Sequence, residues 1–497
     1  MPWWALAVLM LGANFALWGA VGLIRLAESA VARWSAVRAI RTAPAAAAIG
    51  PGRPGAAAGS GSGAAGGSGG RVPAPRAKPG PSLTTSDVAV LIPAHNEALV
   101  IAESLRAIMA LVPASNVHVV SDGSTDDTVA IARQSGARVI STRENVGKAG
   151  ALEEAIARFG LIERFPVVML LDADTRVQPG YFAAALPMFD NPQVVAVAGC
   201  VRTARDRKLS LGGRVLVGHR TRIYAIGQRA LKFGQTWLRS NATPIVPGFA
   251  SMYRTRVLPH MEMNPPGLVI EDFNMTFEVY QKRLGKVGFT LRAVAITQDP
   301  DNLRDYIRQT KRWAVGLWQT VRRHPPRANL FTVMLVLLLL ELVTSSVMFF
   351  LLPLALLVLL VPELAGQVLS WPAFGELHLA VSTHLTLTAV LFGVVLPDFL
   401  ITCAVAVLER QPRLLLLAVF FPLMRMLDAA ISLYSVPAAW LSVSNGRWKS
   451  PARRPVSSAA AAALPVAGRP AGDAYPGGTR DEPGTPARVA EASHVSG

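Results

Sequence analysis

The chain has 497 residues, of which 51% are hydrophobic and only 16% are charged, and its formal net charge is +17. This composition is too apolar for an ordinary soluble protein and indicates an integral membrane protein with a soluble part. Much of the basic excess lies beside apolar runs, which favours membrane anchoring over nucleic-acid binding. Cys200 and Cys403 lie in apolar contexts without metal-ligand spacing, so a disulfide framework is not supported and the soluble part is expected in the cytoplasm.

The first predicted element is a membrane-spanning helix near the N-terminus. Residues 3–24 form an apolar run long enough to cross a bilayer, and no basic segment precedes the run as it would in a signal peptide. Arginines follow the run, so its C-terminal end should face the cytoplasm. We therefore predict an N-terminal transmembrane helix over residues 1–28 and a flexible linker, rich in Ala, Gly and Pro, over residues 29–86.

From residue 87 onward, short apolar runs alternate with helical stretches. The predicted strands are DVAVLIPA, NVHVVS, ARVIS and PVVMLL, and the predicted helices are 98–111, 126–136 and 148–160. This alternation predicts βαβ units and a mostly parallel sheet in an α/β domain. Ligands of such sheets bind beyond the carboxyl ends of the strands, which is where Asn96, Asp122 and Asp172 fall.

Long apolar runs resume after the soluble part and predict transmembrane helices within residues 329–443. The runs are 329–361, 380–408 and 412–443. The basic segment 447–454 should be cytoplasmic, which requires an even number of spans after the soluble domain and favours four over three. Arg425 and Asp428 lie on one helix face, where they either line a path through the membrane or hold helices together. The basic segment and a disordered tail make up residues 444–497.

Several polar segments have residues suited to chemistry, although each also has an ordinary structural explanation. Asp172 and Asp174 follow a buried strand, where two carboxylates suit a divalent ion and a diphosphate but also suit a turn. Asp122 is placed to accept a hydrogen bond from a nucleoside, or else to belong to a turn before a helix cap. Lys148 precedes a helix and is either a phosphate ligand or a surface lysine.

Two later segments have the same two explanations. Glu271 and Asp272 open a predicted helix, where acids either stabilise the helix dipole or supply a general base for an acceptor hydroxyl. In QTKRW, the guanidinium of Arg312 fits a phosphate and the indole face of Trp313 fits a sugar ring. Basic and aromatic residues also mark a membrane surface, so neither segment decides the function by itself.

The order of these segments resembles the inverting family 2 glycosyltransferases, and more narrowly their processive membrane members, the cellulose, chitin, hyaluronan and poly-N-acetylglucosamine synthases. The shared order is PAHNE, DGS, GKAGAL, DAD, ED and QTKRW, within roughly residues 87–325, followed by membrane spans. The resemblance implies a GT-A fold, a Rossmann-like α/β nucleotide-diphospho-sugar transferase domain in the cytoplasm, joined to an α-helical transmembrane domain in the plasma membrane. It also implies transfer from a UDP-sugar, with UDP-N-acetylglucosamine favoured, to a growing polysaccharide.

The resemblance further implies roles for individual residues. Asp272 is expected to be the catalytic base, and Asp174 is expected to be a ligand of Mg²⁺ or Mn²⁺ on the diphosphate. Glu97 and Asp122 match positions that hold uridine, and Asp172 matches a position near the nucleotide. The expected substrate-binding residues are thus Glu97, Asp122, Lys148 and Asp172, together with Gln309, Arg312 and Trp313 of QxxRW at the diphosphate and the acceptor end.

Some positions depart from the family pattern. Ile270 stands where the TED-type motif has Thr, Glu153 stands where Asn is frequent, and PGFAS at 247–251 replaces a Cys-Gly pattern of cellulose and hyaluronan enzymes. The PGFAS segment counts against the cellulose and hyaluronan types, and the size and layout of the chain favour the poly-N-acetylglucosamine type. Two alternatives stay open, a non-processive transferase acting on a lipid-linked acceptor and a membrane transport or scaffold protein with a degenerate transferase domain. The expected partners are the UDP-sugar, a polysaccharide or lipid-linked acceptor, membrane lipid and a small membrane subunit, but not nucleic acid.

Overall fold

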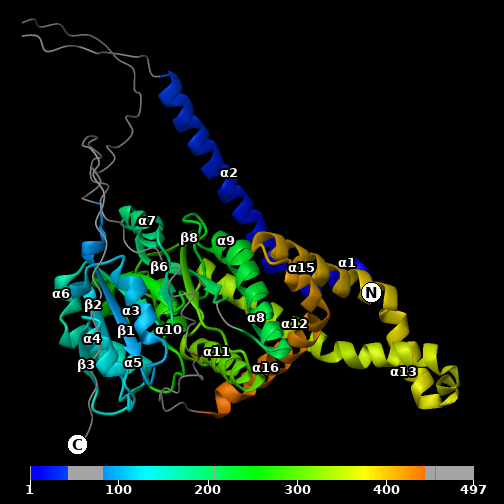
Figure 1. Cartoon of the computed structure of the whole chain (residues 1–497). Helices are drawn as coiled ribbons and strands as arrows, with labels where there is room; N and C mark the ends of the chain where they lie inside the picture. The colour runs from blue at the N-terminus through cyan, green and yellow to red at the C-terminus, as the bar shows by residue number, and fades with distance from the viewer. Residues whose placement is uncertain (1, 43–81, 206–207, 443–453, 455–497) are drawn as a thin grey trace, which may run out of the picture.

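The computed structural model describes residues 2–42, 82–205, 208–442 and 454, and the expectations for the linker over 43–81 and for most of the tail lie outside these residues. An α/β domain is joined on one side to long apolar helices (Figure 1). Helix α2 runs over Ala13–Thr42, so residues 29–42 are helical and do not belong to the predicted linker.

An eight-stranded sheet forms the centre of the α/β domain, in the order β3-β2-β1-β4-β7-β6-β8-β5. The predicted βαβ units supply four parallel strands, which are β1 (Val88–Ala94), β2 (Val117–Ser121), β3 (Arg138–Ser141) and β4 (Val167–Leu171). The remaining strands are β5 (Arg176–Val177), β6 (Val194–Thr203), β7 (Ala250–Arg254) and β8 (Lys286–Thr297). Strand β7 runs antiparallel to both β4 and β6, so the sheet is mixed, where a mostly parallel sheet was predicted.

Helices cover both faces of this sheet. All side chains of β1, which point alternately to one face and to the other, are therefore buried. Val90 and its alternate neighbours pack with α3 and α7, whereas Leu91 packs with α5 and α10. The helices of the domain are α3 (Ile101–Met109), α4 (Thr128–Gln134), α5 (Gly147–Arg158), α6 (Leu161–Arg164), α7 (Tyr181–Ala185) and α10 (Glu271–Gln281). The sheet is therefore a fixed platform whose loops at the carboxyl ends are free to carry polar residues.

A layer of helices lies between the α/β domain and the apolar helices. It contains α8 (Leu211–Ile226), the π-helical turn η4 (Gly227–Lys232), α9 (Phe233–Gln235), α11 (Leu303–Arg323) and α16 (Phe421–Leu441). Helix α16 packs along α11, where Lys311 donates to the hydroxyl of Tyr434 at 2.9 Å and Arg322 donates to the carbonyl of Ala439 at 2.8 Å. This layer connects the sheet to the apolar part of the chain.

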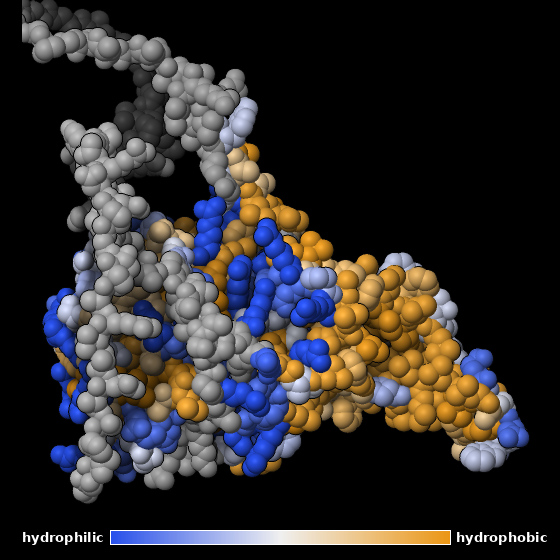
Figure 2. All heavy atoms as spheres, in the orientation of Figure 1, coloured by the Kyte–Doolittle hydropathy of each residue, from blue (hydrophilic) through white to orange (hydrophobic). Residues whose placement is uncertain are grey.

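Three helical segments of the described residues are long and apolar enough to cross a membrane, namely Leu330–Leu364, Leu387–Leu408 and Pro412–Leu441. The run predicted at 329–361 is one helix, α12 (Leu330–Leu364), so three such segments follow the α/β domain where four spans were favoured. The other elements of this part are η6 (Gly366–Ser370), α13 (Pro372–His384), α14 (Leu387–Val390), η7 (Leu391–Val395), α15 (Leu396–Leu408) and η8 (Pro412–Phe420). Figure 2 shows hydrophobic residues covering this helical arm and hydrophilic residues gathering on the α/β domain and at the junction.

The predicted N-terminal span is broken into two helices, α1 (Trp3–Leu11) and α2, with a bend of 71°. Gly12 stands at the break with φ of +86°, and a β-carbon there would overlap the carboxylate of Glu341 in α12. That carboxylate accepts hydrogen bonds from the backbone N–H of Asn14 at 2.9 Å and from its side-chain amide at 2.8 Å. Glu341 therefore satisfies the first turn of α2, which explains why the apolar run does not form one straight helix.

Candidate active site

The loops that follow β1 and β2 are bonded to one another at the carboxyl edge of the sheet. His95 Nδ1 lies 2.5 Å from the carbonyl oxygen of Asp122, and Asn96 Oδ1 accepts from the backbone N–H of Thr125 at 2.8 Å. Glu97 is buried, and its backbone N–H donates to Thr128 Oγ1 at 2.9 Å. The PAHNE and DGS segments thus form one rigid unit, and the contact of Glu97 with uridine stays a prediction.

The carboxylate of Asp122 is fully buried and positions the start of α5. It accepts hydrogen bonds from the backbone N–H groups of Val146 at 2.8 Å and Gly147 at 3.0 Å, and from Thr142 Oγ1 at 3.2 Å. The geometry gives Asp122 a role in fixing the loop before Lys148, while its predicted contact with uridine stays a prediction.

Lys148 is the point at which three predicted segments meet. Its Nζ lies 2.8 Å from Asp172 Oδ1 and 2.9 Å from Glu271 Oε1, and it donates to the carbonyl of Gly248 at 3.4 Å. Burial alone would lower the pKa of Lys148, but the charges of Asp172 and Glu271 outweigh burial and raise the pKa above its ordinary value. The alternative of a surface lysine is therefore wrong, and the contact with phosphate remains a prediction.

Gly248 in the PGFAS segment lies against this cluster, and sequence reasoning did not select it as a site residue. A β-carbon at Gly248 would lie 2.9 Å from Lys148 Nζ and 3.0 Å from Glu271 Oε1. The backbone N–H of Gly248 also faces Asp272 Oδ2 at 3.4 Å. A β-carbon at this position would therefore force the ends of the Lys148 and Glu271 side chains to shift.

Asp272 lies directly beside this cluster at the start of α10. Its Oδ1 accepts from the backbone N–H of Phe273 at 2.8 Å. Burial and the adjacent charge of Glu271 raise the pKa of Asp272 to about 6, although the charge of Lys148 acts in the opposite direction. A carboxylate with a pKa near the working pH is suited to accept a proton from a hydroxyl group.

Asp174 supplies a second carboxylate at the end of β4. Its Oδ1 lies 3.2 Å from Thr175 Oγ1 and 3.4 Å from Thr297 Oγ1. Within the described ranges, no group of three or more His, Cys, Asp or Glu side chains is arranged to hold a metal ion. Mg²⁺ is commonly held by one or two carboxylates together with substrate phosphates, so Asp172 and Asp174 fit an ion that arrives with a diphosphate.

Helix α11 carries QTKRW and is docked onto the segment that contains the ED pair. A β-carbon at Gly316 would lie 2.3 Å from Cγ1 of Ile270, and Gln319 Oε1 accepts from the backbone N–H of Val269 at 3.1 Å. Ile270, which stands in place of the family's Thr, is therefore a packing residue between α10 and α11. This contact fixes the distance between the QxxRW helix and Asp272.

The charge of Arg312 reaches the ED pair. Burial would raise the pKa of Glu271, but the charges of Lys148 and, more weakly, Arg312 lower it. In the part of the chain that the structure describes, the Arg312 guanidinium makes no hydrogen bond or ion pair with another side chain, which leaves it available to an anionic ligand. The structure thus brings Lys148, Asp172, Asp272 and Arg312 together, as the motif order predicts.

Gln309 and Trp313 lie one turn apart on α11 and share a neighbour that sequence reasoning missed. Arg220 of α8 donates to Gln309 Oε1 at 3.3 Å, and its guanidinium carbon lies 4.5 Å from the centre of a Trp313 ring. Arg220 belongs to none of the recognised segments. The signal in the sequence is a polar stretch from His219 to Arg222 that lies between apolar residues in the middle of α8.

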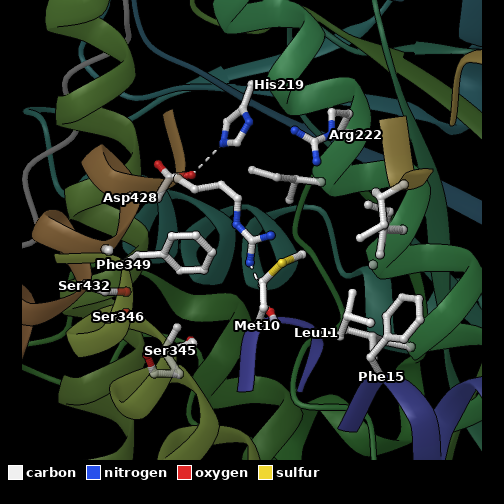
Figure 3. A pocket seen from close by; sticks show the side chains of 18 residues that line it. Met10, Leu11, Phe15, His219, Arg222, Ser345, Ser346, Phe349, Asp428 and Ser432 are labelled. Carbon is white, nitrogen blue, oxygen red and sulfur yellow. Dashed lines mark hydrogen bonds and ion pairs between the residues drawn. The ribbon is translucent and has the colours of Figure 1, made fainter. Parts of the chain in front are cut away.

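A cavity of ≈ 340 Å³ lies at the junction, apart from the charged cluster, between α1, α8, α12, α15 and α16. Figure 3 shows His219 and Asp428 bonded to one another in its lining, together with the apolar side chains of Met10, Phe15 and Phe349. Arg425 donates to Asp398 Oδ1 at 3.1 Å and to the carbonyl of Met10 at 3.2 Å. Arg425 and Asp428 therefore hydrogen-bond to other helices and also line the cavity. Their contacts are compatible with both roles considered for them, holding helices together and lining a path.

Comparison with known sequences agrees with this geometry. Residues 86–316 match the family described as Glycosyltransferase like family 2. The chain is 29% identical over 254 residues to the uncharacterized glycosyltransferase YaiP of Escherichia coli, covering 49% of this chain and 60% of that protein. It is 27% identical over 242 residues to the probable glycosyltransferase YdaM of Bacillus subtilis, covering 46% of this chain and 54% of that protein. These matches span less than two thirds of the relatives' own length.

Solved structures with a related chain path include two nucleotide-sugar enzymes. One is the mannosyltransferase PcManGT from Pyrobaculum calidifontis in complex with GDP-Man and Mn²⁺, with 19% identity, 72% of this chain and 89% of that chain covered, and a TM-score of 0.44. The other is glucosyl-3-phosphoglycerate synthase from Mycobacterium tuberculosis, with 21% identity, 46% and 78% covered, and a TM-score of 0.31. Residues 86–316 are therefore similar to the family described as Glycosyltransferase like family 2, and the mixed α/β sheet formed by the described residues is compatible with a nucleotide-sugar transferase.

Proposed function

We propose that the protein is a membrane-bound, inverting glycosyltransferase that moves a sugar from a UDP-sugar, with UDP-N-acetylglucosamine favoured, to a growing polysaccharide in a processive manner. One observation carries this proposal. Lys148 joins the DAD and ED segments, and the Ile270–Gly316 contact fixes the QxxRW helix against the same ED segment. Residues suited to the donor, the base and the acceptor are thereby held at one edge of the sheet.

The proposed reaction uses this arrangement directly. Asp272 accepts the proton of the acceptor hydroxyl, and the oxygen attacks the anomeric carbon from the side opposite the leaving UDP. The new glycosidic bond forms as the bond to the diphosphate breaks, which inverts the configuration. Arg312 neutralises charge on the departing diphosphate, and Trp313 stacks on the terminal sugar of the acceptor and holds it in place.

A divalent cation fits the same site as a partner of the nucleotide. Asp174, with Asp172 beside it, would hold Mg²⁺ or Mn²⁺ together with the diphosphate. When bound, the ion would supply positive charge that stabilises the leaving group. Lys148 keeps Asp172 in place from the opposite side through its 2.8 Å ion pair.

The proposed membrane arrangement places the active site at the cytoplasmic surface. Glu409, at the end of α15, contacts Arg205 of the α/β domain at 3.1 Å, and Arg454, beyond α16, contacts Asp301 at 2.8 Å. Both ends of the η8–α16 segment thus lie on the side of the α/β domain. This supports two crossings after the domain, by α12 and by the segment Leu387–Leu408, with α16 lying along α11 at the membrane surface.

Thiol labelling tests this topology. In sealed vesicles, a cysteine introduced in place of Gln367 in η6 should react from the side opposite the α/β domain. A cysteine in place of Arg410, next to Glu409, should react from the same side as the domain. Labelling of both positions from one side would contradict two crossings.

The junction cavity favours a second candidate, transfer to a lipid-linked acceptor. The cavity is mostly apolar and carries Arg222 and Arg425, a combination suited to a lipid chain with an anionic group. Asp428 in its lining accepts a hydrogen bond from the hydroxyl of Tyr306 in α11 at 2.8 Å, which connects the cavity wall to the QxxRW helix. A single transfer to such a lipid would use the same base and the same donor site.

One assay separates the two functions. Membranes containing the full chain are incubated with Mg²⁺ or Mn²⁺ and a panel of labelled UDP-sugars, with GDP-mannose for comparison, and UDP release and product size are measured. Label in high-molecular-weight material supports the processive synthase, and label in an organic-extractable lipid supports the second function. The matched control is Asp272→Asn, which should bind nucleotide but transfer no sugar. Transfer by that variant at the wild-type rate would contradict the assigned base.

A further inference from the structure

Arg220 contacts one face of the QxxRW helix over two turns. Its side chain is almost fully buried, with 2% exposed. The guanidinium carbon lies 4.4 Å from the ring centre of Tyr306 and 4.5 Å from that of Trp313. These rings are seven positions apart and therefore lie on the same face of α11. Arginine stacks on aromatic faces in this way, and the contact is stronger away from water.

The same guanidinium also orients polar groups between the two rings. One terminal nitrogen donates to Thr310 Oγ1 at 2.6 Å and to Gln309 Oε1 at 3.3 Å. Because a guanidinium has only donors, Arg220 pairs with the carbonyl oxygen of the Gln309 amide and not with its nitrogen. The amide nitrogen of Gln309 is thereby directed away from Arg220. Gln309 is thus set to present N–H donors, which suit a hydroxyl or phosphate oxygen.

Arg220 is supported on its far side by a partly buried chain of hydrogen bonds. The hydroxyl of Tyr306 donates to Asp428 Oδ1 at 2.8 Å. Asp428 Oδ2 lies 2.8 Å from His219 Nε2, which is adjacent to Arg220 on α8. The hydrogen bonds thus lead from Tyr306 through Asp428 back to α8, the helix that carries Arg220. Tyr306 and Arg220 are therefore held against one another. Such closed support restricts the orientation of the groups that bind a ligand.

We infer that Arg220 is a positioning residue for the acceptor-binding face of α11, which holds the Trp313 ring and the Gln309 amide in the orientations that sugar transfer uses. The expected loss of activity rests on the proposed function. The positioning of Trp313 and Gln309 rests on the contacts described above. Arg220 itself acts through Trp313 and Gln309. Misplacement of a substrate by about 1 Å lowers rates by about 100-fold, so loss of this support should lower kcat/KM for the acceptor by about 10- to 100-fold.

Two variants of the full membrane-embedded chain test the inference. Arg220→Met removes the charge and the hydrogen bonds, and Arg220→Lys keeps the charge but loses the planar stacking. Both should lower kcat/KM for the acceptor, with Lys retaining more activity than Met, while the dissociation constant for UDP stays within about twofold because the contacts of Asp122 and Lys148 are untouched. Arg214→Met is the matched control, since Arg214 is an exposed arginine on the same helix.

A double-mutant cycle distinguishes positioning from a general effect on folding. In a Trp313→Ala background, Arg220→Lys should cause little further loss of activity, because its main target is already absent. Losses that multiply in the double variant would overturn the inference, as would wild-type kinetics of both Arg220 variants. The activity of the wild type separates the role of Arg220 from the proposed function. A wild type that transfers no sugar from any donor would contradict the proposed function and not the role of Arg220.

A spectroscopic measurement tests the positioning without requiring activity. With fluorotryptophan incorporated, the ¹⁹F resonance of Trp313 is assigned as the signal absent from Trp313→Phe. This resonance should shift in Arg220→Lys and keep its position in Arg214→Met. An unchanged Trp313 resonance in the Arg220 variant would refute the inference even if the enzyme were inactive.

Discussion

The strongest prediction concerns the pH dependence of sugar transfer, because it follows from charges around one carboxylate. Burial and Glu271 raise the pKa of Asp272 to about 6. A base must be ionised to accept a proton, so activity should be present above this pKa and lost as the pH falls through it. With a pKa of about 6, about nine-tenths of Asp272 is ionised at pH 7 and about one-tenth at pH 5. We therefore expect kcat/KM to fall about tenfold between these values.

Two neighbours should move this midpoint in opposite directions. Glu271→Gln removes a negative charge next to Asp272 and should shift the midpoint to lower pH. Lys148→Met removes the positive charge 2.9 Å from Glu271 and should shift it to higher pH, whatever its effect on the maximal rate. Each shift of one pKa unit corresponds to about 1.4 kcal/mol of interaction.

The assay is initial-rate transfer at limiting acceptor, since kcat/KM reports ionisation in the free enzyme. Asp272→Asn provides the background at every pH. A profile that stays flat between pH 5 and pH 7 would refute the reasoning. Shifts of the same sign in Glu271→Gln and Lys148→Met would also refute it, because opposite charges cannot act alike on one carboxylate.

The remaining predictions concern packing and the cation. Gly316→Ala places a β-carbon 2.3 Å from Ile270, so it should cost about 1–3 kcal/mol in thermal unfolding and lower activity, and Ile270→Ala in the same chain should restore part of both. Gly12→Ala should destabilise the chain by about 1–3 kcal/mol because of its positive φ and its overlap with a carboxylate. Gly19→Ala, with no atom within 4 Å of its β-carbon, is the control, and equal melting temperatures would contradict the account. Chelation of divalent ions should abolish transfer, with recovery on adding Mn²⁺ or Mg²⁺. Asp174→Asn should raise the cation concentration needed for half-maximal activity, and an unchanged requirement would remove Asp174 as a ligand.

Local sequence patterns were sufficient to predict those elements whose structure is determined by a single segment of the chain. The strands β1 to β4 follow from short apolar runs with polar turns, and their parallel order places Asp122 and Asp172 at one edge. The docking of α11 beside the ED pair follows the family order, although the contact that fixes it is between Ile270 and Gly316. Motif order therefore predicts which residues meet, while some of the residues that hold them together, such as Gly316 and Arg220, belong to no motif.

Features created by contacts distant in sequence were not predictable. The ion pair of Lys148 with Glu271 joins positions 148 and 271, and no periodicity in either segment reports the other. The antiparallel entry of β7 depends on the path of the intervening chain, which includes α8 and α9. Arg220 looked like an ordinary arginine of a helix, since its value arises only from the aromatic rings of α11 that enclose it.

The hydrogen bonds between Asn14 and Glu341 have a consequence for how the chain is made. They join positions 327 residues apart, so the N-terminal helix pair leaves the ribosome long before its partner in α12 exists. Contacts between such distant segments form late, because the intervening loop must close first. The first turn of α2 therefore lacks its capping carboxylate until the whole α/β domain has been synthesised. The contact between α2 and α12 can thus form only after translation has passed the α/β domain, and a nascent chain that stops before α12 lacks the carboxylate that caps α2.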